Sequence, residues 1–132
     1  MTEELMEQAA DTHDHKFILA SRVEGTPVFN PAGDRMGHID DLSVDRYDGT
    51  VNYAIMSFGG FLGIGKKFHP LPWALLDYDP ERGGYVVPLD KEALAGAPHY
   101  DSEELVKLGG PSHESYQSHI VEYYGRYGLP VV

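Results

Sequence analysis

The sequence predicts a mainly β protein, a small barrel or sandwich of short strands followed by helices near the C-terminus. Three observations lead to this fold class. The 132-residue chain contains 15 glycines and 9 prolines, which favour turns and short strands over long helices. Apolar runs recur about every 8–12 residues between glycine-rich turns, as in small barrels and sandwiches. After about residue 90 the apolar residues instead recur at three- and four-residue spacing, as in helices.

The chain divides into three predicted parts. Residues 1–15 are expected to form a flexible acidic tail, because they contain no Lys or Arg and few apolar residues. Residues 16–100 are expected to form the barrel domain, and residues 101–132 a helical extension. A chain of this length is long enough for one domain with a modest core.

The first strand is expected at residues 17–20, which are all apolar. Ser21 then caps a single helical turn that ends at Gly25. A short second strand is expected at residues 27–29, where Pro27 suggests a strand start or an edge. Residues 30–34 have the composition of a turn.

The next two strands form a predicted hairpin. A strand is expected from Met36 onward with a bulge near Asp40 and Asp41, because its apolar residues do not keep to one face. The dipeptide Asp48-Gly49 predicts the hairpin turn. Residues 51–58 alternate over eight positions and form the strongest predicted strand of the chain.

The glycine-rich stretch at residues 59–67 lies near the middle of the chain. It matches part of a phosphate-binding loop, but Lys67 replaces the hydroxyl residue and prolines follow where a helix would have to begin. We therefore interpret the stretch as a connection between two strands. Its apolar residues Phe61, Leu62 and Ile64 either fold over the core or form an exposed contact surface.

Three further strands are expected at residues 67–71, 73–78 and 85–87, with a turn at residues 79–84. Trp73 is the single tryptophan, and we expect it to be buried at one end of the barrel.

Helix signals follow the last strand. Asp90 is the predicted cap of a helix over residues 91–95 that ends at Gly96. Asp101 and Glu104 have the spacing of a capping box. A last helix is expected from Ser112 to about residue 124.

One face of this last helix is rich in aromatic residues. Its members share three- and four-residue spacing and are Tyr116, Ile120, Tyr123, Tyr124 and Tyr127. We call them the C-terminal stripe. We expect the stripe to pack against the barrel or against a second copy of the chain, since such stripes mark buried faces.

Charge and composition argue against several functions. The formal net charge is −11, which disfavours binding to nucleic acids or to anionic membranes. The chain has no cysteine, which excludes thiolate catalysis and sulfur-ligated zinc. No apolar run approaches the length of a membrane span, and no signal peptide is recognisable at the N-terminus. We expect a soluble, cytoplasmic protein.

The sequence contains only weak signals for a catalytic or a metal-binding site. The run His13-Asp14-His15 contains metal-ligand types, but it lies in the predicted tail, where nothing holds a coordination geometry. His38 beside Asp40 is interpreted as a solvated strand end rather than a proton relay, and no serine nucleophile motif is present. We therefore expect no enzyme activity, no cofactor and no metal.

Several segments together resemble the PRC-barrel family, over residues 20 to about 100. They are residues 25–28 (GTPV), 33–42 (GDRMGHIDDL), 48–55 (DGTVNYAI), 59–65 (GGFLGIG), 72–73 (PW) and 94–98 (LAGAP). Known members include the cytoplasmic domain of the photosynthetic reaction-centre H subunit and the C-terminal domain of a ribosome maturation factor. The resemblance implies a small, closed or partly open, strongly bent β-barrel of about six strands, here with short C-terminal helices. It implies no reaction.

The resulting hypothesis is a stand-alone, non-enzymatic protein-interaction or assembly module that self-associates, for example as a homodimer. The predicted interaction surface of this module consists of eight residues, Phe61, Leu62, Ile64, Tyr116, Ile120, Tyr123, Tyr124 and Tyr127. The alternative hypothesis is a regulatory protein that binds a small ligand or a metal in a pocket near Tyr53, His69 and the glycine-rich stretch. Neither hypothesis identifies the partner.

Overall fold

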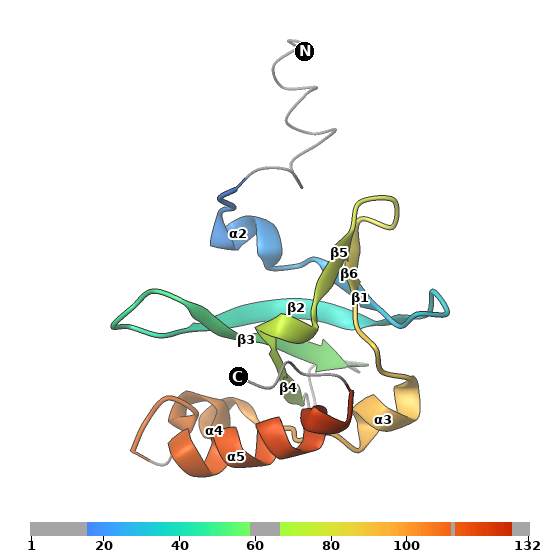
Figure 1. Cartoon of the computed structure of the whole chain (residues 1–132). Helices are drawn as coiled ribbons and strands as arrows, with labels where there is room; N and C mark the ends of the chain where they lie inside the picture. Colours follow the sequence, from blue (N-terminus) through green and yellow to red (C-terminus); the bar gives the residue numbers. More distant parts are fainter. Residues whose placement is uncertain (1–15, 59–66, 112, 128–132) are drawn as a thin grey trace.

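The structure is a computed structural model of the chain, and it describes residues 16–58, 67–111 and 113–127. Within these residues six strands form one sheet, with short helices against it (Figure 1). The strands are β1 (Pro27–Phe29), β2 (Arg35–Val44), β3 (Val51–Phe58), β4 (Phe68–Pro72), β5 (Asp77–Asp79) and β6 (Gly84–Val86). The helical elements are α2 (Ala20–Val23), η1 (Trp73–Leu75), α3 (Lys91–Ala95), α4 (Ser102–Lys107), α5 (His113–Tyr124) and η2 (Gly125–Tyr127).

The strands lie in the order β4-β3-β2-β1-β6-β5, and the pairs are antiparallel except for β1 with β6. The two edge strands, β4 and β5, follow each other in sequence with only η1 and Leu76 between them. The sheet therefore bends until its two ends approach each other at η1. In the described residues no strand pairing joins β4 to β5, so the expected closed barrel is not confirmed and the sheet stays open at this point.

A bulge bends the long strand β2 at Asp40. Ile39 is opposite Met56 and Asp41 is opposite Ile55, so Asp40 has no partner position in the ladder. The Ser57 hydroxyl of β3 donates a hydrogen bond to the carboxylate of Asp40. The predicted bulge is thus confirmed, and it increases the local twist of the strand.

The core lies on both faces of β3, whose side chains from Tyr53 to Ser57 are all buried. Helix α5 packs against β4, and its Ile120 contributes to the same core as Ile39 of β2. Helices α3, α4 and α5 lie on one side of the sheet, and α2 lies on the opposite side (Figure 1). None of the helices in the described ranges combines the length and the apolar character that crossing a membrane requires.

Several local predictions are confirmed. The hairpin turn at Asp48-Gly49 and the strand at residues 51–58 are present. The Asp90 carboxylate accepts a hydrogen bond from the backbone nitrogen of Ala93 at 2.7 Å and caps α3. Both hydrogen bonds of the capping box at Asp101 are formed at the start of α4.

Two strand predictions are wrong. Residues 17–19 are not part of the sheet, and α2 begins at Ala20, with Leu19 rather than the predicted Ser21 as its N-cap. Residues 73–75 form η1, and β5 begins only at Asp77. The chain turns here between the two sheet edges, and the half-buried ring of Trp73 lies 5.9 Å from that of Tyr85. The predicted tail at residues 1–15, the glycine-rich residues 59–66 and the cap at Ser112 lie outside the described residues.

The close approach of β6 to β1 yields a prediction about Gly84. A Cβ atom at this position would lie 2.5 Å from the carbonyl oxygen of Pro27 and 2.7 Å from the ring of Phe29. Because β1 and β6 are paired, the backbone cannot yield freely, and Gly84→Ala should lower the free energy of unfolding by about 1–3 kcal/mol. Urea denaturation measures this change.

Gly109→Ala is the matched control, since a Cβ atom there meets no atom within 4 Å. We expect its free energy of unfolding to stay within about 0.5 kcal/mol of the unmodified chain. Equal destabilisation by both substitutions would contradict the close approach at Gly84.

Candidate functional site

The β2–β3 hairpin projects beyond the sheet (Figure 1), and its turn is held by side-chain hydrogen bonds. Asp45 Oδ1 accepts hydrogen bonds from the backbone nitrogens of Tyr47 at 2.8 Å and Asp48 at 3.2 Å. Asp48 Oδ1 accepts from the hydroxyl and the backbone nitrogen of Thr50 at 2.7 and 2.9 Å. These bonds lower the pKa of the Asp48 carboxyl. The turn is therefore preorganised in one conformation.

This fixed turn holds an aromatic ring in solvent. The side chain of Tyr47 has an exposed fraction of 101%, and Val44 at the base of the turn is half exposed. The ring makes no contribution to the core, although the burial of a tyrosine ring is strongly favourable. Exposed tyrosines on rigid supports are enriched among residues that dominate protein–protein binding. Tyr47 is therefore a candidate contact residue.

Beside the turn lies a cleft of about 390 Å³, between the hairpin and the connection from α4 to α5. We call it the hairpin cleft; its lining residues are Ser43, Val44, Asp45, Arg46, Tyr47, Asn52, Tyr53, Leu108, Gly109, His113 and Gln117. Tyr53 and Leu108 are buried, whereas Asn52, His113 and Gln117 are exposed. Burial, and then Tyr100, raises the pKa of the Tyr53 phenol, which keeps it a neutral hydrogen-bond donor. The cleft thus combines an apolar part with polar groups.

A second, wider groove of about 490 Å³ runs between residues 96–100 and α5. Arg126 and Glu122 both line it, so it presents no single sign of charge. The guanidinium of Arg126 lies over the Tyr123 ring at 5.5 Å. His99 and His119 also line the groove, but within the described residues no three His, Asp or Glu side chains are arranged to hold a metal ion. We assign the groove no function.

One hydrogen-bonded group contains the residue types of a catalytic triad, namely His38, Asp40 and Ser57. Its hydrogen bonds, however, do not connect the three side chains in the sequence that a triad requires. The Asp40 carboxylate lies between the other two: Ser57 donates to it, and His38 Nε2 lies 3.1 Å from its Oδ1. In a triad the histidine must contact the serine in order to accept its proton. Here Ser57 is buried and bonded to a carboxylate, so the group holds the bulge of β2 together.

His69 and Tyr53, the pocket residues of the ligand hypothesis, do not share one of the cavities that the described residues form. Tyr53 lines the hairpin cleft, whereas His69 is buried on β4 with its ring 5.5 Å from that of His99 and is not among the lining residues of either cavity. Burial, and then the neighbouring His99, lowers the pKa of His69 to about 4. His69 is therefore neutral at pH 7.

The C-terminal stripe packs against the sheet of its own chain. Ile120 and Tyr124 are fully buried, and Tyr116, Tyr123 and Tyr127 are half buried against the same core. A partner can reach only the outer parts of these three tyrosines. Phe61, Leu62 and Ile64 lie outside the described residues, and the role of all eight residues as an interaction surface stays a prediction.

Sequence reasoning missed Tyr47 and the hairpin cleft. One signal was present: Tyr47 is an aromatic residue inside a turn of otherwise polar residues, Asp45 to Thr50. The cleft had no signal in the sequence, because it lies between the β2–β3 hairpin and the start of α5, which are more than 50 positions apart.

A comparison with protein families identifies one match: the model of the PRC-barrel domain matches residues 15–94. The matched range includes all six strands of the described sheet and most of α3. Helix α5 and the connection from α4 to α5, which form one wall of the hairpin cleft, lie beyond it. No curated protein matches the chain.

We expect opposite effects on the free energy of unfolding when two neighbouring tyrosines of α5 are replaced by phenylalanine. The hydroxyl of Tyr124 is buried without a hydrogen-bond partner among the described residues, whereas that of Tyr123 donates to the carbonyl oxygen of Ala93. Tyr124→Phe should therefore leave the free energy of unfolding unchanged or raise it by about 1 kcal/mol. Tyr123→Phe should lower it by about 1 kcal/mol. Urea denaturation compares the pair, and the reverse order would contradict these hydrogen-bond assignments.

We expect acidification to lower the stability of the folded chain through the protonation of His69. Because its pKa is about 4 in the folded chain and near 6.5 in a model peptide, the unfolded chain takes up the proton first as the pH falls. Above pH 6.5 the titration of His69 does not change the free energy of unfolding. Between pH 6.5 and pH 4 it should lower this free energy by up to about 1.4 kcal/mol for each pH unit.

Denaturation at several pH values tests this dependence. His69→Gln should flatten the loss of stability in that interval, while the carboxylates contribute equally to both chains. Tyr124→Phe is the control: burial raises the pKa of its phenol above the usual value, so its removal should leave the slope between pH 6.5 and pH 4 unchanged. Parallel curves for His69→Gln and the unmodified chain would count against a buried neutral His69.

Proposed function

The chain belongs to the PRC-barrel domain family, and on that premise we propose that it is a non-enzymatic protein-interaction or assembly module. The observation that carries the proposal is Tyr47, an exposed aromatic ring on a preorganised turn beside a cleft. A turn held by its own side chains loses little conformational entropy when a partner binds, and this favours affinity. The proposed docking surface consists of Tyr47, Val44 and the hairpin cleft.

The charge of the chain supports a particular class of partner. At a net charge of −11 the chain attracts basic surfaces and repels nucleic acids. The buried Tyr53 and Leu108 of the cleft suit an apolar side chain of the partner. We infer a protein partner with a basic surface and a projecting apolar residue. A cytoplasmic location, which fits the absence of cysteine, is part of the same proposal.

Self-association is the second part of the proposal. The expected interface was the C-terminal stripe, but α5 buries most of the stripe within its own chain. A second copy would therefore need another surface. Light scattering of the full-length chain over a dilution series measures this part directly.

Replacing Tyr47 tests the docking surface. Full-length tagged chain is recovered from its native cells, the partner that it retains is purified, and the dissociation constant is measured for each variant. Tyr47→Ser should weaken binding at least about tenfold, as loss of a dominant contact residue does, with an unchanged melting temperature.

Val121→Ser on α5 is the matched control, because Val121 is also exposed and apolar but does not line the hairpin cleft. Its dissociation constant should equal that of the unmodified chain. Equal affinity of Tyr47→Ser and the unmodified chain for the partner would overturn the docking surface, and so would a chain that retains no partner at all.

A further inference from the structure

Three consecutive apolar side chains next to α2 are exposed. Phe17, Ile18 and Leu19 have exposed fractions of 81, 54 and 70%. We call them the N-terminal strip. Leu19 has the extended backbone of a strand, with φ −73° and ψ 137°. The strip has strand-forming composition, yet in the part of the chain that the structure describes it belongs to no strand. Runs of exposed apolar residues of this kind mark contact surfaces.

The strip is attached to a fixed part of the fold. Val23 of α2 is buried, and the backbone after it pairs with β2, since Gly25 nitrogen donates to the carbonyl oxygen of Ile39 at 2.6 Å. Two exposed basic residues, Lys16 and Arg22, flank the strip. The chain therefore presents a positively charged, apolar segment on an otherwise acidic molecule.

The sheet offers an edge of matching character at β5. This strand pairs with β6 on one side, and no described strand pairs with its other side. Its sequence is Asp77-Tyr78-Asp79, with Tyr78 41% exposed and its ring 5.3 Å from that of Tyr85. Such an edge exposes backbone donors and acceptors that can pair with a further strand.

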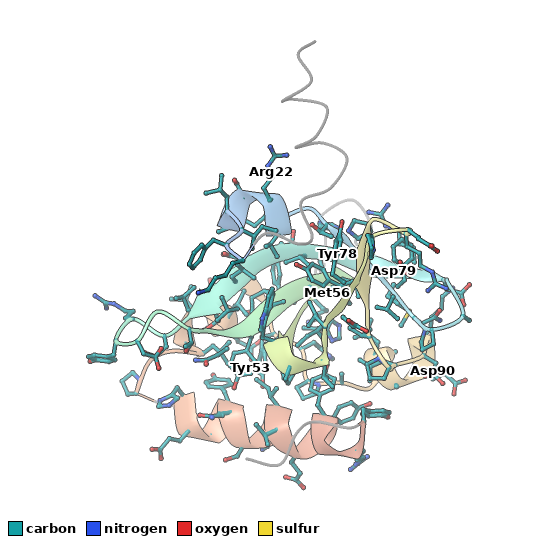
Figure 2. All side chains as sticks on the ribbon, turned by 45° about the horizontal axis from the view of Figure 1, so that its top comes forward. Arg22, Tyr53, Met56, Tyr78, Asp79 and Asp90 are labelled. Atoms are coloured by element: carbon teal, nitrogen blue, oxygen red, sulfur yellow. The ribbon has the colours of Figure 1, made fainter. Side chains whose placement is uncertain are left out.

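The other edge of the sheet is less available. Tyr100 forms a two-way backbone bridge to Phe68 of β4, with both N···O distances at 2.9 Å, and α5 packs against the same strand. The strip and β5 lie on the side of the molecule away from α5 (Figure 1), where Arg22 points outward and Tyr78 and Asp79 lie on the same side (Figure 2).

We propose that the N-terminal strip of one copy pairs as an additional strand with the outer edge of β5 of a second copy. Lys16 then lies near Asp77, and the apolar strip covers the exposed ring of Tyr78. Strand addition to an open edge is a common mode of recognition, because backbone hydrogen bonds and side-chain pockets act together. Two reciprocal contacts produce a symmetric dimer. The inference rests on the self-association in the proposed function and names its surfaces.

Complementing variants test this contact. Ile18→Glu places a negative charge in the strip, near Asp77, and Asp77→Lys places a positive charge on the edge, near Lys16. Both positions are exposed, so neither substitution should change the melting temperature. By light scattering, the unmodified chain should have the mass of two copies and each variant alone the mass of one.

Mixing the two variants should restore the dimer, because each variant supplies the surface that the other lacks. High salt should weaken the unmodified dimer, since the flanking charges are exposed. Val106→Glu is the control: Val106 on α4 is also exposed and apolar, and it should keep the dimer.

Three results would overturn the contact. If both variants still form the dimer, the strip and the edge of β5 do not form its interface, although the chain does self-associate. Monomeric unmodified chain at every concentration would remove self-association as well, but it would leave the Tyr47 docking surface standing. Variants that stay monomeric when mixed would show that the strip and the edge do not pair with each other.

Discussion

The bulge at Asp40 is the constraint on which the rest of this structure depends. The extra residue has no place in the β2–β3 ladder, and its carboxylate is held by Ser57 from the neighbouring strand. Next to it, Ile39 forms backbone hydrogen bonds with Gly25 and Thr26, which attach α2 to the same point. Because a bulge bends and twists its strand, one long hairpin can curl the whole sheet until its two edges meet at η1.

This curvature also explains why the candidate contact surfaces lie at the periphery. Both faces of β3 are buried, and α5 covers β4, so the centre of the sheet is fully used for stability. Among the described residues, exposed apolar side chains lie at the tip of the hairpin, in the N-terminal strip and on β5, as well as at Val106 of α4 and Val121 of α5. The hairpin cleft includes residues of α5, whereas the strip and β5 lie on the side away from α5. A dimer joined through the strip therefore leaves the hairpin cleft accessible to another protein.

Structural features that depend on neighbouring residues were predicted correctly from the sequence, whereas features that depend on distant segments were not. The caps of α3 and α4, the Asp48-Gly49 turn and the bulge were predicted correctly, because each depends on residues within a few positions. The strand at residues 17–20 was wrong: Ala20 begins α2, and residues 17–19 belong to no strand of the described sheet. The strand predicted at residues 73–78 was wrong in its first part, because the chain turns between two sheet edges at η1 and β5 begins only at Asp77. The stripe of α5 was recognised, but its spacing did not reveal which surface it would cover.

The sequence alone determined the mainly β class, the hairpin, the capped helices and the family, because turn chemistry, alternation and helix capping act over short stretches. Only the tertiary structure decided that, among the described residues, no strand pairing joins β4 to β5 and that the stripe packs inward. It also placed Tyr47 beside a cleft and left the strip outside the strands of the described sheet. These outcomes depend on which distant segments approach one another. That approach follows from the free energy of packing the whole chain, and this free energy cannot be deduced from any single stretch of the sequence.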